Sequence, residues 1–338
     1  MVDHDILFGK AKMIVVQTPL RLSLLGGGTD FEDFYLRHGG AVLSTAIDKY
    51  VFVIVKERFD DMIYVNYSKK EKTDSFDKLE HELVREVMRI TGVTKGVEIT
   101  TLADVPAYGT GLGSSSSVTV GLLQALYAYQ GELKTAETLA REACQIEINT
   151  LGKPIGRQDQ YIAAYGNMRF ITFNNKDVKL EKIQLSSEDK RRLNENLLLF
   201  FTGLGTNSNE VLSEQKANIN NRLETLSKMR GFAFQAKDYI LAGAFDELGK
   251  LLDRSWRLKK QLASKISNSK IDEMYETARK AGAIGGKIAG SGGGGFLLLY
   301  CPKERQDEVR KALKGLRELP FRFEQDGSKV IFNYRTTS

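Results

Sequence analysis

Residues 107 to 129 read AYGTGLGSSSSVTVGLLQALYAY, in which three glycines at alternate positions precede four serines. Gly109, Gly111 and Gly113 leave the backbone free to take positive φ angles and to approach a ligand closely. Ser114 and Ser115 stand where a helix is expected to begin, so unpaired N–H groups and the positive end of the helix dipole would face the loop. This arrangement binds anions, phosphate in particular. The alternative interpretation is a flexible turn with a serine N-cap.

The spacing does not match the two best-known phosphate-binding loops. A P-loop requires G-x-x-x-x-G-K-[ST], and the nearest segment here, AGAIGGKI, has Ala281 for the first glycine and Ile288 for the hydroxyl residue. The dinucleotide-binding fingerprint requires G-x-G-x-x-G directly after a strand. This chain has G-x-G-x-G, and Asp104, Val105 and Pro106 separate it from the preceding apolar stretch. A different kind of phosphate loop is therefore expected.

Two further segments combine glycines with hydroxyl or acidic residues. Residues 18 to 35, TPLRLSLLGGGTDFEDFY, end an apolar pattern in three glycines followed by Thr29 and Asp30. Residues 287 to 300, KIAGSGGGGFLLLY, place five glycines around Ser291. Each segment alone is consistent with a tight turn. Because all three glycine-rich loops border strongly patterned structure, we expect them to form one shared site.

The composition is that of an ordinary globular protein. The chain has 338 residues, enough for two domains, with 42% hydrophobic and 27% charged residues. Its net charge of +6 results from 49 Lys and Arg against 43 Asp and Glu. Because no basic run alternates with aromatic residues, we predict no nucleic-acid partner. The positive excess suits small anionic substrates.

Several other classes of protein are disfavoured by the sequence. Cys144 and Cys301 lie far apart and the three histidines form no H-x-x-x-H pair, so we expect neither a disulfide framework nor a histidine metal site. The first twenty residues lack a signal-peptide pattern, and no apolar run approaches the roughly 20 residues of a membrane span. We therefore expect a cytoplasmic protein that does not associate with membranes, of undetermined oligomeric state.

The elements that would position these loops form a mixed α and β pattern. Strands are expected at 13–16, 20–25, 51–56, 62–67 and 97–101, and helices at 77–90, 115–129 and 135–149. The second half predicts strands at 197–202, 283–288, 296–300, 321–323 and 330–334, with helices at 208–228, 231–250, 271–280 and 304–313. Gly282 is expected to end the third of these helices. The polar stretch 174–190 is the expected domain boundary.

In order, the three glycine-rich segments resemble the motifs of the GHMP small-molecule kinases, such as galactokinase, homoserine kinase and mevalonate kinase. The first resembles P-x-[RK]-x-x-x-x-G-E/G-x-x-D, the second G-x-G-L-G-S-S-[SA] and the third K-x-[ST]-G-[SA]-G-G-G-G, with Ala289 where a hydroxyl residue is common. The resemblance implies an α+β fold of two domains. Residues 12–175 would form an ATP-binding domain like domain 2 of ribosomal protein S5, and residues 176–338 a ferredoxin-like domain.

The resemblance implies phosphoryl transfer from ATP with the help of Mg²⁺. The ATP-binding residues would be those of the middle motif: Gly109, Thr110, Gly111, Leu112, Gly113, Ser114, Ser115 and Ser116. Ser115 and Glu147 would be the metal ligands, since Mg²⁺ usually takes one or two protein ligands. The competing interpretation of Glu147 is a carboxylate on a solvated helix face.

Two catalytic residues are also implied by the resemblance. Residues 156–160 match the family's G-x-x-D-Q pattern, so Asp159 would take the acceptor proton as general base or orient the acceptor hydroxyl. Arg21 stands where relatives carry Arg or Lys beside the transferred phosphate, and as an arginine it would stabilise charge. The alternative interpretation of Asp159 is an aspartate in a turn or helix cap, and that of Arg21 is a strand arginine that pairs with a neighbour. Lys287 is equally consistent with an ordinary surface lysine.

The acceptor would bind at the first and third segments, at Gly26, Gly27, Gly28, Thr29, Asp30, Gly292 and Gly293. Asp30 matches the aspartate that binds sugar hydroxyls in galactokinases, but glycines replace the Glu and His of their G-E-H-x-D pattern, which disfavours galactose. Within the family, the segments are close to those of D-glycero-D-manno-heptose 7-phosphate kinases, which phosphorylate the anomeric hydroxyl on the route to GDP-heptose and surface polysaccharides. Lys153 and Arg157 are candidates to hold the 7-phosphate, or are solvent-facing charges.

Four alternatives remain consistent with the sequence. Fucokinases share the G-G-G-T-D pattern, so L-fucose is a competing acceptor. A decarboxylase of the mevalonate diphosphate type would use the same ATP site. A non-catalytic sugar-binding relative would keep the ligands without turnover, although Ser115, Glu147 and Asp159 are all present. An RNA-binding module is suggested only by the basic charge and the ribosomal-type domain.

Overall fold

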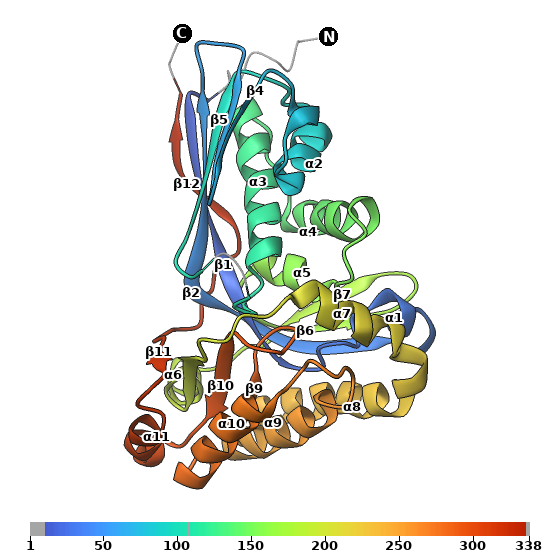
Figure 1. Cartoon of the computed structure of the whole chain (residues 1–338), viewed down its shortest axis with the longest axis vertical. Coiled ribbons are helices and arrows are strands. Elements are labelled where there is room, and N and C mark those ends of the chain that lie inside the picture. Colours follow the sequence, from blue (N-terminus) through green and yellow to red (C-terminus); the bar gives the residue numbers. More distant parts are fainter. Residues whose placement is uncertain (1–10, 107–108, 336–338) are drawn as a thin grey trace.

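The computed structural model describes residues 11–106 and 109–335. The chain forms two parts, an upper part built on a long curved sheet with helices on one side and a lower part with a smaller sheet and a layer of helices (Figure 1). Within the described residues, the first sheet has eight strands and the second has four. The expected α+β fold class is confirmed.

The first sheet is organised around two long antiparallel strands. Its members are β1 (Met13–Leu25), β2 (Gly40–Glu57), β3 (Ile63–Asn66), β4 (Lys70–Thr73), β5 (Val97–Ala103), β6 (Met168–Phe173), β7 (Val178–Lys182) and β12 (Lys329–Tyr334). Strand β2 pairs with β1, β5 and β6, and β3 runs parallel to β5. The associated helices are α1 (Glu32–His38), α2 (Glu82–Thr91), α3 (Ser114–Gln130), α4 (Ala136–Cys144) and α5 (Gln158–Tyr165).

Two strand predictions in this half are corrected by the structure. The stretches expected at 13–16 and 20–25 are one strand, and 51–56 is only the second half of β2. Side chains of β1 alternate in burial up to Gln17 and are all buried from Thr18 onward, because α3, α8 and α9 also contact this strand. The first half of β2 is likewise continuously buried. Strands that are buried on both faces show near-continuous apolar runs instead of an alternating pattern, so their ends are poorly marked in the sequence.

The second sheet has the expected ferredoxin-like arrangement. Its strands are β8 (Leu197–Phe201), β9 (Gly285–Ile288), β10 (Phe296–Tyr300) and β11 (Arg317–Glu318), in the antiparallel order β11-β8-β10-β9. Its helices are α6 (Ser187–Glu195), α7 (Ser208–Ala217), α8 (Leu223–Leu241), α9 (Phe245–Lys259), α10 (Ser269–Ala281) and α11 (Gln306–Ala312). After α6, the succession is β-α-β-β-α-β, with α7 to α10 in the first connection.

The two long helices predicted in this half are in fact three. A short 3-10 turn, Ile219–Arg222, separates α7 from α8, and Gly243, with a φ of 68°, separates α8 from α9. The expected strand at 321–323 forms only one isolated bridge, between Ile47 and Phe323. Gly282 ends α10 as predicted.

The chain returns to the first sheet at its C-terminal end. Strand β12 pairs with β1, and β7 pairs with β6, so both lie in the first sheet although the expected boundary assigned 176–338 to the second domain. That boundary stays a prediction. One hydrophobic cluster runs from Leu22 of β1 to Leu252 of α9, so the two parts share a packed core.

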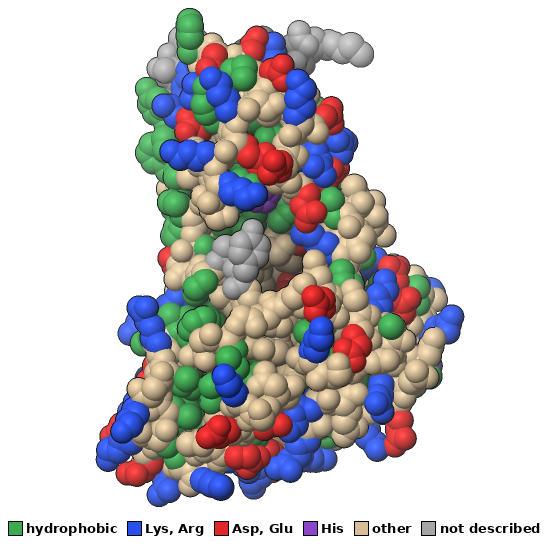
Figure 2. Space-filling view, viewed as in Figure 1, with side chains coloured by type: hydrophobic (Ala, Val, Ile, Leu, Met, Phe, Trp, Pro, Cys, Tyr) green, Lys and Arg blue, Asp and Glu red, His purple; other side chains and the backbone are tan. Residues whose placement is uncertain are grey.

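The surface drawn in Figure 2 carries basic and acidic side chains interspersed over both parts, with no single basic face. No helix among the described residues is both long enough and apolar enough to cross a membrane.

Candidate active site

The middle glycine-rich segment has the backbone geometry that its sequence predicts. Gly109, Gly111 and Gly113 have φ angles of 71°, 73° and 79°, which side-chain-bearing residues rarely adopt. Gly113 directly precedes α3, a helix of 17 residues with no acidic residue in its first turn. The N–H groups of the first turn of α3 lack intrahelical partners, which is the geometry suited to binding an anion at the end of this loop.

The three glycine-rich segments meet, as predicted. A Cβ atom on Gly111 would lie 2.3 Å from the carbonyl oxygen of Ala289, and one on Gly290 would lie 2.5 Å from the Cα of Gly111. The backbone N–H of Arg21 donates to the carbonyl oxygen of Leu112 at 2.9 Å. Glycine is needed where two loops approach this closely, because any side chain would separate them.

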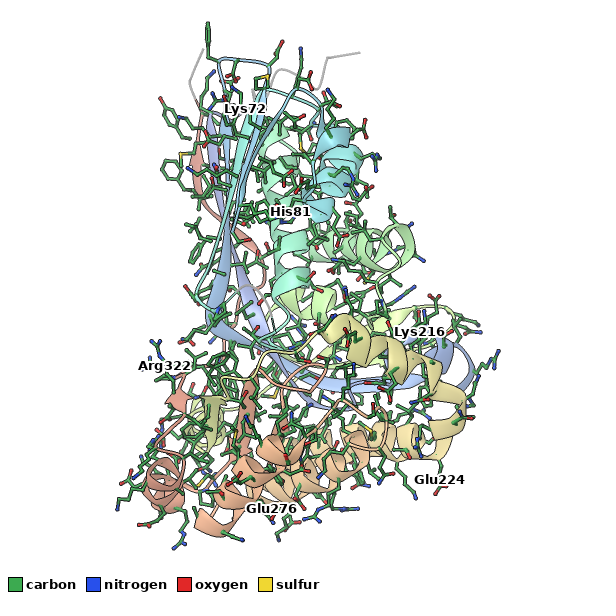
Figure 3. All side chains as sticks on the ribbon, viewed as in Figure 1. Lys72, His81, Lys216, Glu224, Glu276 and Arg322 are labelled. Atoms are coloured by element: carbon green, nitrogen blue, oxygen red, sulfur yellow. The ribbon has the colours of Figure 1, made fainter. Side chains whose placement is uncertain are left out.

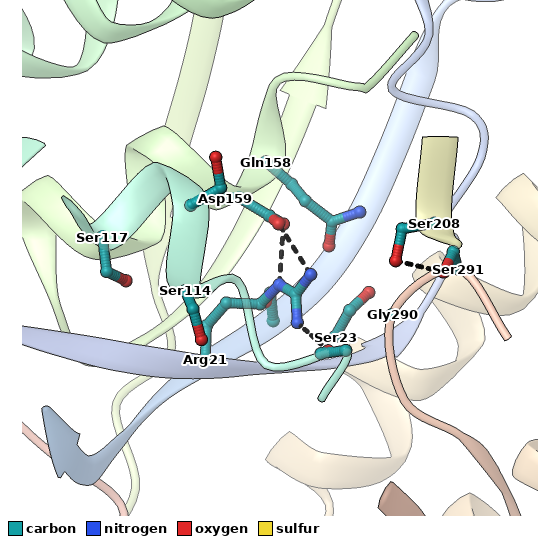
Figure 4. Close-up of polar contacts among 12 residues, drawn as sticks. Arg21, Ser23, Ser114, Ser117, Gln158, Asp159, Ser208, Gly290 and Ser291 are labelled. Carbon is teal, nitrogen blue, oxygen red and sulfur yellow. Dashed lines mark hydrogen bonds and ion pairs between the residues drawn. The ribbon is translucent and has the colours of Figure 1, made fainter. Parts of the chain in front are cut away.

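Arg21 and Asp159 form a two-pronged ion pair at this meeting point. The Nε and Nη2 atoms of Arg21 each donate to one carboxylate oxygen of Asp159 at 2.6 Å, and Nη1 donates to the carbonyl oxygen of Gly111 at 2.5 Å (Figure 4). Irregularities in the pairing of β1 with β2 flank Arg21, at Pro19/Leu20 and near Ser23. Such bulges redirect side chains beside active sites.

Asp159 keeps capacity to bind a further group. It lies in the first turn of α5, and its side chain is partly exposed whereas that of Arg21 is almost fully buried. A carboxylate offers about four lone-pair positions, of which Arg21 occupies two. Asp159 can therefore accept a hydrogen bond from an acceptor hydroxyl while Arg21 holds it in place.

Glu147 faces the start of α3. It lies in a π-helical segment, Gln145–Thr150, that directly continues α4, and its side chain is fully buried. Ser115 Oγ donates to its Oε1 at 2.8 Å, and Gln160 Nε2 donates to its Oε2 at 2.7 Å. The alternative interpretation of a solvated carboxylate is wrong. A π-turn within a helix is typical of functional sites, and here it accompanies the carboxylate that contacts Ser115.

The Ser115–Glu147 pair fits a magnesium ion shared with nucleotide phosphates. Mg²⁺ takes one or two protein oxygens and completes its shell with water and phosphate. Among the described residues no cluster of three or more His, Cys, Asp or Glu could hold a metal ion, so this protein offers a partial shell only. The ammonium group of Lys153 lies 3.3 Å from Ser115 Oγ and 3.8 Å from Glu147 Oε1. A cation thus already lies beside both oxygens.

A cavity opens beside the Arg21–Asp159 pair, between the two parts of the molecule. The first and third glycine-rich segments and the start of α5 contribute to its lining, together with residues of α7 and α9. The lining includes Arg21, Ser23, Gly27, Gly28, Asp30, Gly156, Gln158, Asp159, Gln215, Lys259, Lys287, Gly290 and Ser291. We call this the acceptor cavity.

Asp30 organises one wall of the acceptor cavity. Its Oδ1 accepts from the N–H of Gly28 at 3.0 Å, and its Oδ2 accepts from the N–H and Nε2 of Gln158 at 3.2 and 3.1 Å. Burial, and then the charge of Asp159, raises the pKa of Asp30 above its ordinary value. A Cβ atom on Gly156 would lie 2.1 Å from Asp30 Oδ2, so this contact requires a glycine.

Two buried polar atoms of the same wall lack a partner within the described residues, Ser23 Oγ and Gln158 Oε1. Buried polar groups are normally hydrogen-bonded. Because both residues line the acceptor cavity, a ligand with hydroxyl groups would satisfy both atoms.

Four predicted acceptor residues do not line the cavity. The Thr29 hydroxyl donates to the carbonyl oxygen of Gly26 at 2.8 Å, so these two residues stabilise the turn itself. Gly292 packs against Ile266, and Gly293 packs against Thr206. The neighbouring residues Gly290 and Ser291 line the cavity in their place.

The basic side chains that line the acceptor cavity are not those that the sequence suggested as candidates to hold the 7-phosphate. Lys153 contacts the Ser115–Glu147 pair, and Arg157 lies against Tyr35 and pairs with Glu32 at 3.6 Å, so neither lines the acceptor cavity. Lys287 is not a surface lysine, because only 4% of it is exposed. Lys259 is also buried in this wall, and since it belongs to no motif only the tertiary structure reveals it.

Comparison with known proteins identifies the family. Residues 78–167 match the pattern described as GHMP kinases N terminal domain, and residues 236–316 match GHMP kinases C terminal. A D-glycero-alpha-D-manno-heptose 7-phosphate kinase of Campylobacter jejuni is 30% identical over 321 residues, which cover 90% of this chain and 94% of that protein. The chain belongs to the GHMP kinase family.

Other GHMP kinases resemble the chain over most of its length. A crystal structure of a D-glycero-D-manno-heptose 1-phosphate kinase from Bacteroides thetaiotaomicron superposes with a TM-score of 0.79 at 27% identity, covering 96% of this chain and 100% of that one. A bifunctional fucokinase/GDP-fucose pyrophosphorylase of Arabidopsis thaliana is 24% identical over 88% of this chain and 31% of its own length. GHMP kinases use ATP as phosphate donor, and the predicted ATP-dependent phosphotransferase is confirmed.

Proposed function

We propose that this GHMP kinase transfers the γ-phosphoryl group of ATP to the anomeric hydroxyl of D-glycero-D-manno-heptose 7-phosphate. The product would be the 1,7-bisphosphate, an intermediate for GDP-heptose and surface polysaccharides. The observation that carries the reaction is the Arg21–Asp159 pair. It lies where the middle glycine-rich segment, residues 109–113, which we call the phosphate loop, meets the acceptor cavity. The choice of acceptor is supported by the similarity to a heptose 7-phosphate kinase.

The donor side of the site is the phosphate loop and the start of α3. We expect the ATP phosphates to accept hydrogen bonds from the backbone N–H groups of residues 113–116, which point along the helix axis. Ser115 and Glu147 would hold Mg²⁺, which would neutralise charge on the nucleotide phosphates. Lys153 would have to move from its contact with Ser115.

On the acceptor side, Asp159 would accept a hydrogen bond from the anomeric hydroxyl. It would take the proton as the bond from this oxygen to the γ-phosphorus forms and the bond from the γ-phosphorus to ADP breaks, so that ADP leaves with the electron pair. Arg21 fixes the carboxylate and lies beside Gly111 of the phosphate loop, so its positive charge would stabilise the transferring phosphoryl group. Ser23, Asp30 and Gln158 would bind the other sugar hydroxyls through the wall described above.

L-fucose is the second candidate acceptor, because the chain resembles the fucokinase of Arabidopsis thaliana. That acceptor carries no phosphate. A non-catalytic sugar-binding role is the third candidate, and the complete Arg21–Asp159 and Ser115–Glu147 pairs argue against it.

The test is ADP release from Mg-ATP with four acceptors, D-glycero-D-manno-heptose 7-phosphate, L-fucose, galactose and mevalonate. Phosphorus NMR would identify the phosphorylated atom. A new anomeric phosphate on the heptose phosphate alone would support the proposal. Turnover of L-fucose alone would make L-fucose the acceptor in place of the heptose phosphate. ATP binding without any turnover would favour the non-catalytic sugar-binding role.

A further inference from the structure

Two lysines of the second part of the molecule line the acceptor cavity. Lys259 is the last residue of α9, and Lys287 lies in β9. They are only 6% and 4% exposed. By contrast, the charged side chains labelled in Figure 3 lie at the outside, for example Lys72 at the end of the first sheet and Glu276 on α10.

Neither lysine has a carboxylate partner among the described residues. The ammonium group of Lys259 donates to the carbonyl oxygen of Gly290, and that of Lys287 donates to the carbonyl oxygens of Ser23 and Leu24 at 2.7 and 3.3 Å. A buried ammonium group is costly unless an anion compensates it. Burial lowers the pKa of Lys259 to about 7 and that of Lys287 well below its ordinary value.

The charges that line the cavity do not balance. Its cations are Arg21, Lys259 and Lys287, and its anions are Asp30 and Asp159. The bidentate contact with Arg21 already compensates Asp159, and N–H donors already hold both oxygens of Asp30. The second part of the molecule therefore presents positive charge to the cavity, and no carboxylate of the described residues forms an ion pair with it, although Asp30 lies within electrostatic range of both lysines.

We propose that Lys259 and Lys287 bind a phosphate group that the acceptor itself carries, at the end remote from the reacting hydroxyl. This inference rests on the proposed sugar-kinase function and specifies its substrate class, a sugar phosphate. Lysine is a common phosphate ligand that acts as a point charge.

The position of the lysines favours the acceptor over the nucleotide. ATP phosphates have their own site at the start of α3. Lys287 contacts the carbonyl oxygens of Ser23 and Leu24, the residues of β1 that lie in sequence between Arg21 and the turn that carries Asp30. Asp159 and Asp30 belong to the first part and the lysines to the second, so a bound sugar phosphate would span the interface between the two parts.

The test compares wild type with Lys259→Met and Lys287→Met on two acceptors, D-glycero-D-manno-heptose 7-phosphate and the unphosphorylated heptose. The measured quantity is the ratio of the two kcat/KM values. We expect wild type to have the higher kcat/KM on the heptose 7-phosphate. In each variant the ratio of the two kcat/KM values should fall roughly 10- to 100-fold, mainly through a higher KM for the heptose 7-phosphate, because a charged hydrogen bond is lost. Lys259→Arg should restore part of this ratio.

Lys260→Met is the matched control, because Lys260 is the next residue and pairs with Asp272 on α10, outside the cavity. It should leave the preference unchanged. Thermal unfolding of all variants would check folding, and removal of an uncompensated buried charge should leave stability equal or higher. An equal loss of kcat on both acceptors would place the lysines at the transferring phosphoryl group and overturn the proposal, as would an unchanged preference.

Calorimetry without ATP tests the phosphate-binding site separately from the proposed kinase activity. If wild type binds the heptose phosphate more tightly than the heptose, and the lysine variants lose this difference, the phosphate site stands even when no turnover is found. In that case only the proposed kinase substrate fails. If wild type binds both sugars equally, the lysine site itself is overturned.

Discussion

Asp159 is the residue on which the proposed chemistry depends most directly. Both its carboxylate oxygens accept hydrogen bonds from Arg21. Asp159→Asn keeps the size of the side chain and one oxygen that can accept a hydrogen bond, but it removes the negative charge. We expect kcat to fall about 10²- to 10⁴-fold, the usual contribution of a general base, while ATP affinity is retained. Steady-state kinetics and equilibrium ATP binding would measure the two effects.

Asp272→Asn is the control for this substitution, since Asp272 is half-exposed on α10 and pairs with Lys260. It should behave as wild type. Turnover of Asp159→Asn within a few-fold of wild type would remove Asp159 from the mechanism.

The charge of Lys259 is expected to make acceptor use dependent on pH. Burial and the charge of Arg21 lower the pKa of Lys259 to about 7 while Asp30 opposes the shift, so free enzyme loses this positive charge as the pH rises through 7. Lys287, on β9, is the other cation facing this region. Because kcat/KM reports the free enzyme, kcat/KM for the sugar phosphate should fall by up to about tenfold per pH unit above 7.

The pH profile has two internal controls. The unphosphorylated heptose should not show this decline, and Lys259→Met should flatten the profile with the sugar phosphate. A decline of equal size with both acceptors would assign the titration to another group.

At the scale of elements, the π-helical turn after α4 brings Glu147 to the start of α3. Glu147→Gln removes the charge and keeps the size, so the site should hold Mg²⁺ less tightly. We expect the Mg²⁺ concentration for half-maximal activity to rise about 10- to 100-fold, the range found when groups around a metal site are altered. Titration of activity with Mg²⁺ at fixed ATP would measure it.

Glu142→Gln is the matched control, because Glu142 lies in α4 itself and accepts a hydrogen bond from the Tyr127 hydroxyl at 2.9 Å, away from Ser115. An unchanged Mg²⁺ requirement in Glu147→Gln would contradict the assigned role.

Substitution of glycine by alanine should lower stability at Gly111, where the phosphate loop contacts the third glycine-rich loop, and raise it at Gly231, where there is no such contact. In Gly111→Ala, both the φ of 73° and the close carbonyl oxygen of Ala289 oppose a side chain, so we expect a loss of about 1–3 kcal/mol in stability and weaker use of ATP. Gly231 lies within α8 with no atom near its Cβ position. There alanine should add about 0.5–1 kcal/mol. Chemical denaturation would measure both, and equal effects would contradict the argument.

At the scale of the whole molecule, the C-terminal strand β12 closes the first sheet against β1. Truncation after Ser328 would remove this pairing and leave the edge of β1 from Met13 to Gln17 unpaired. We expect a loss on the order of 3 kcal/mol, from several backbone hydrogen bonds, together with self-association through the free edge. Thermal unfolding and light scattering would detect these effects. Ile331→Thr, on an exposed residue of β12, should change neither.

Local sequence was enough to predict the helix after the middle glycine-rich segment, the strand at 296–300 and the helix at 271–280, whereas the ferredoxin-like fold of the second half was predicted from the resemblance to the family. These elements have their pattern and their end signals in neighbouring residues, such as Gly113 before α3 and Gly282 after α10. Strand β6 and the first half of β2 were not predicted. The first half of β2 is buried on both faces and shows no alternation, and β6 shows only a broken one over six residues, so the local pattern of each is weak.

The motifs alone were sufficient to predict the family, the meeting of the three glycine-rich loops and Arg21, Asp159, Ser115 and Glu147 as candidate site residues, because motif spacing reflects a backbone geometry that only certain residues allow. The ion pair between Arg21 and Asp159 was found only in the structure. The composition of the acceptor wall required the folded chain. Gly290 and Ser291 line it rather than Gly292 and Gly293, and Lys259 joins it from the end of α9. Burial, and the lack of an ion-pair partner among the described residues, are properties of packing between distant segments, so no local pattern could have distinguished Lys259 from its partly exposed neighbour Lys260.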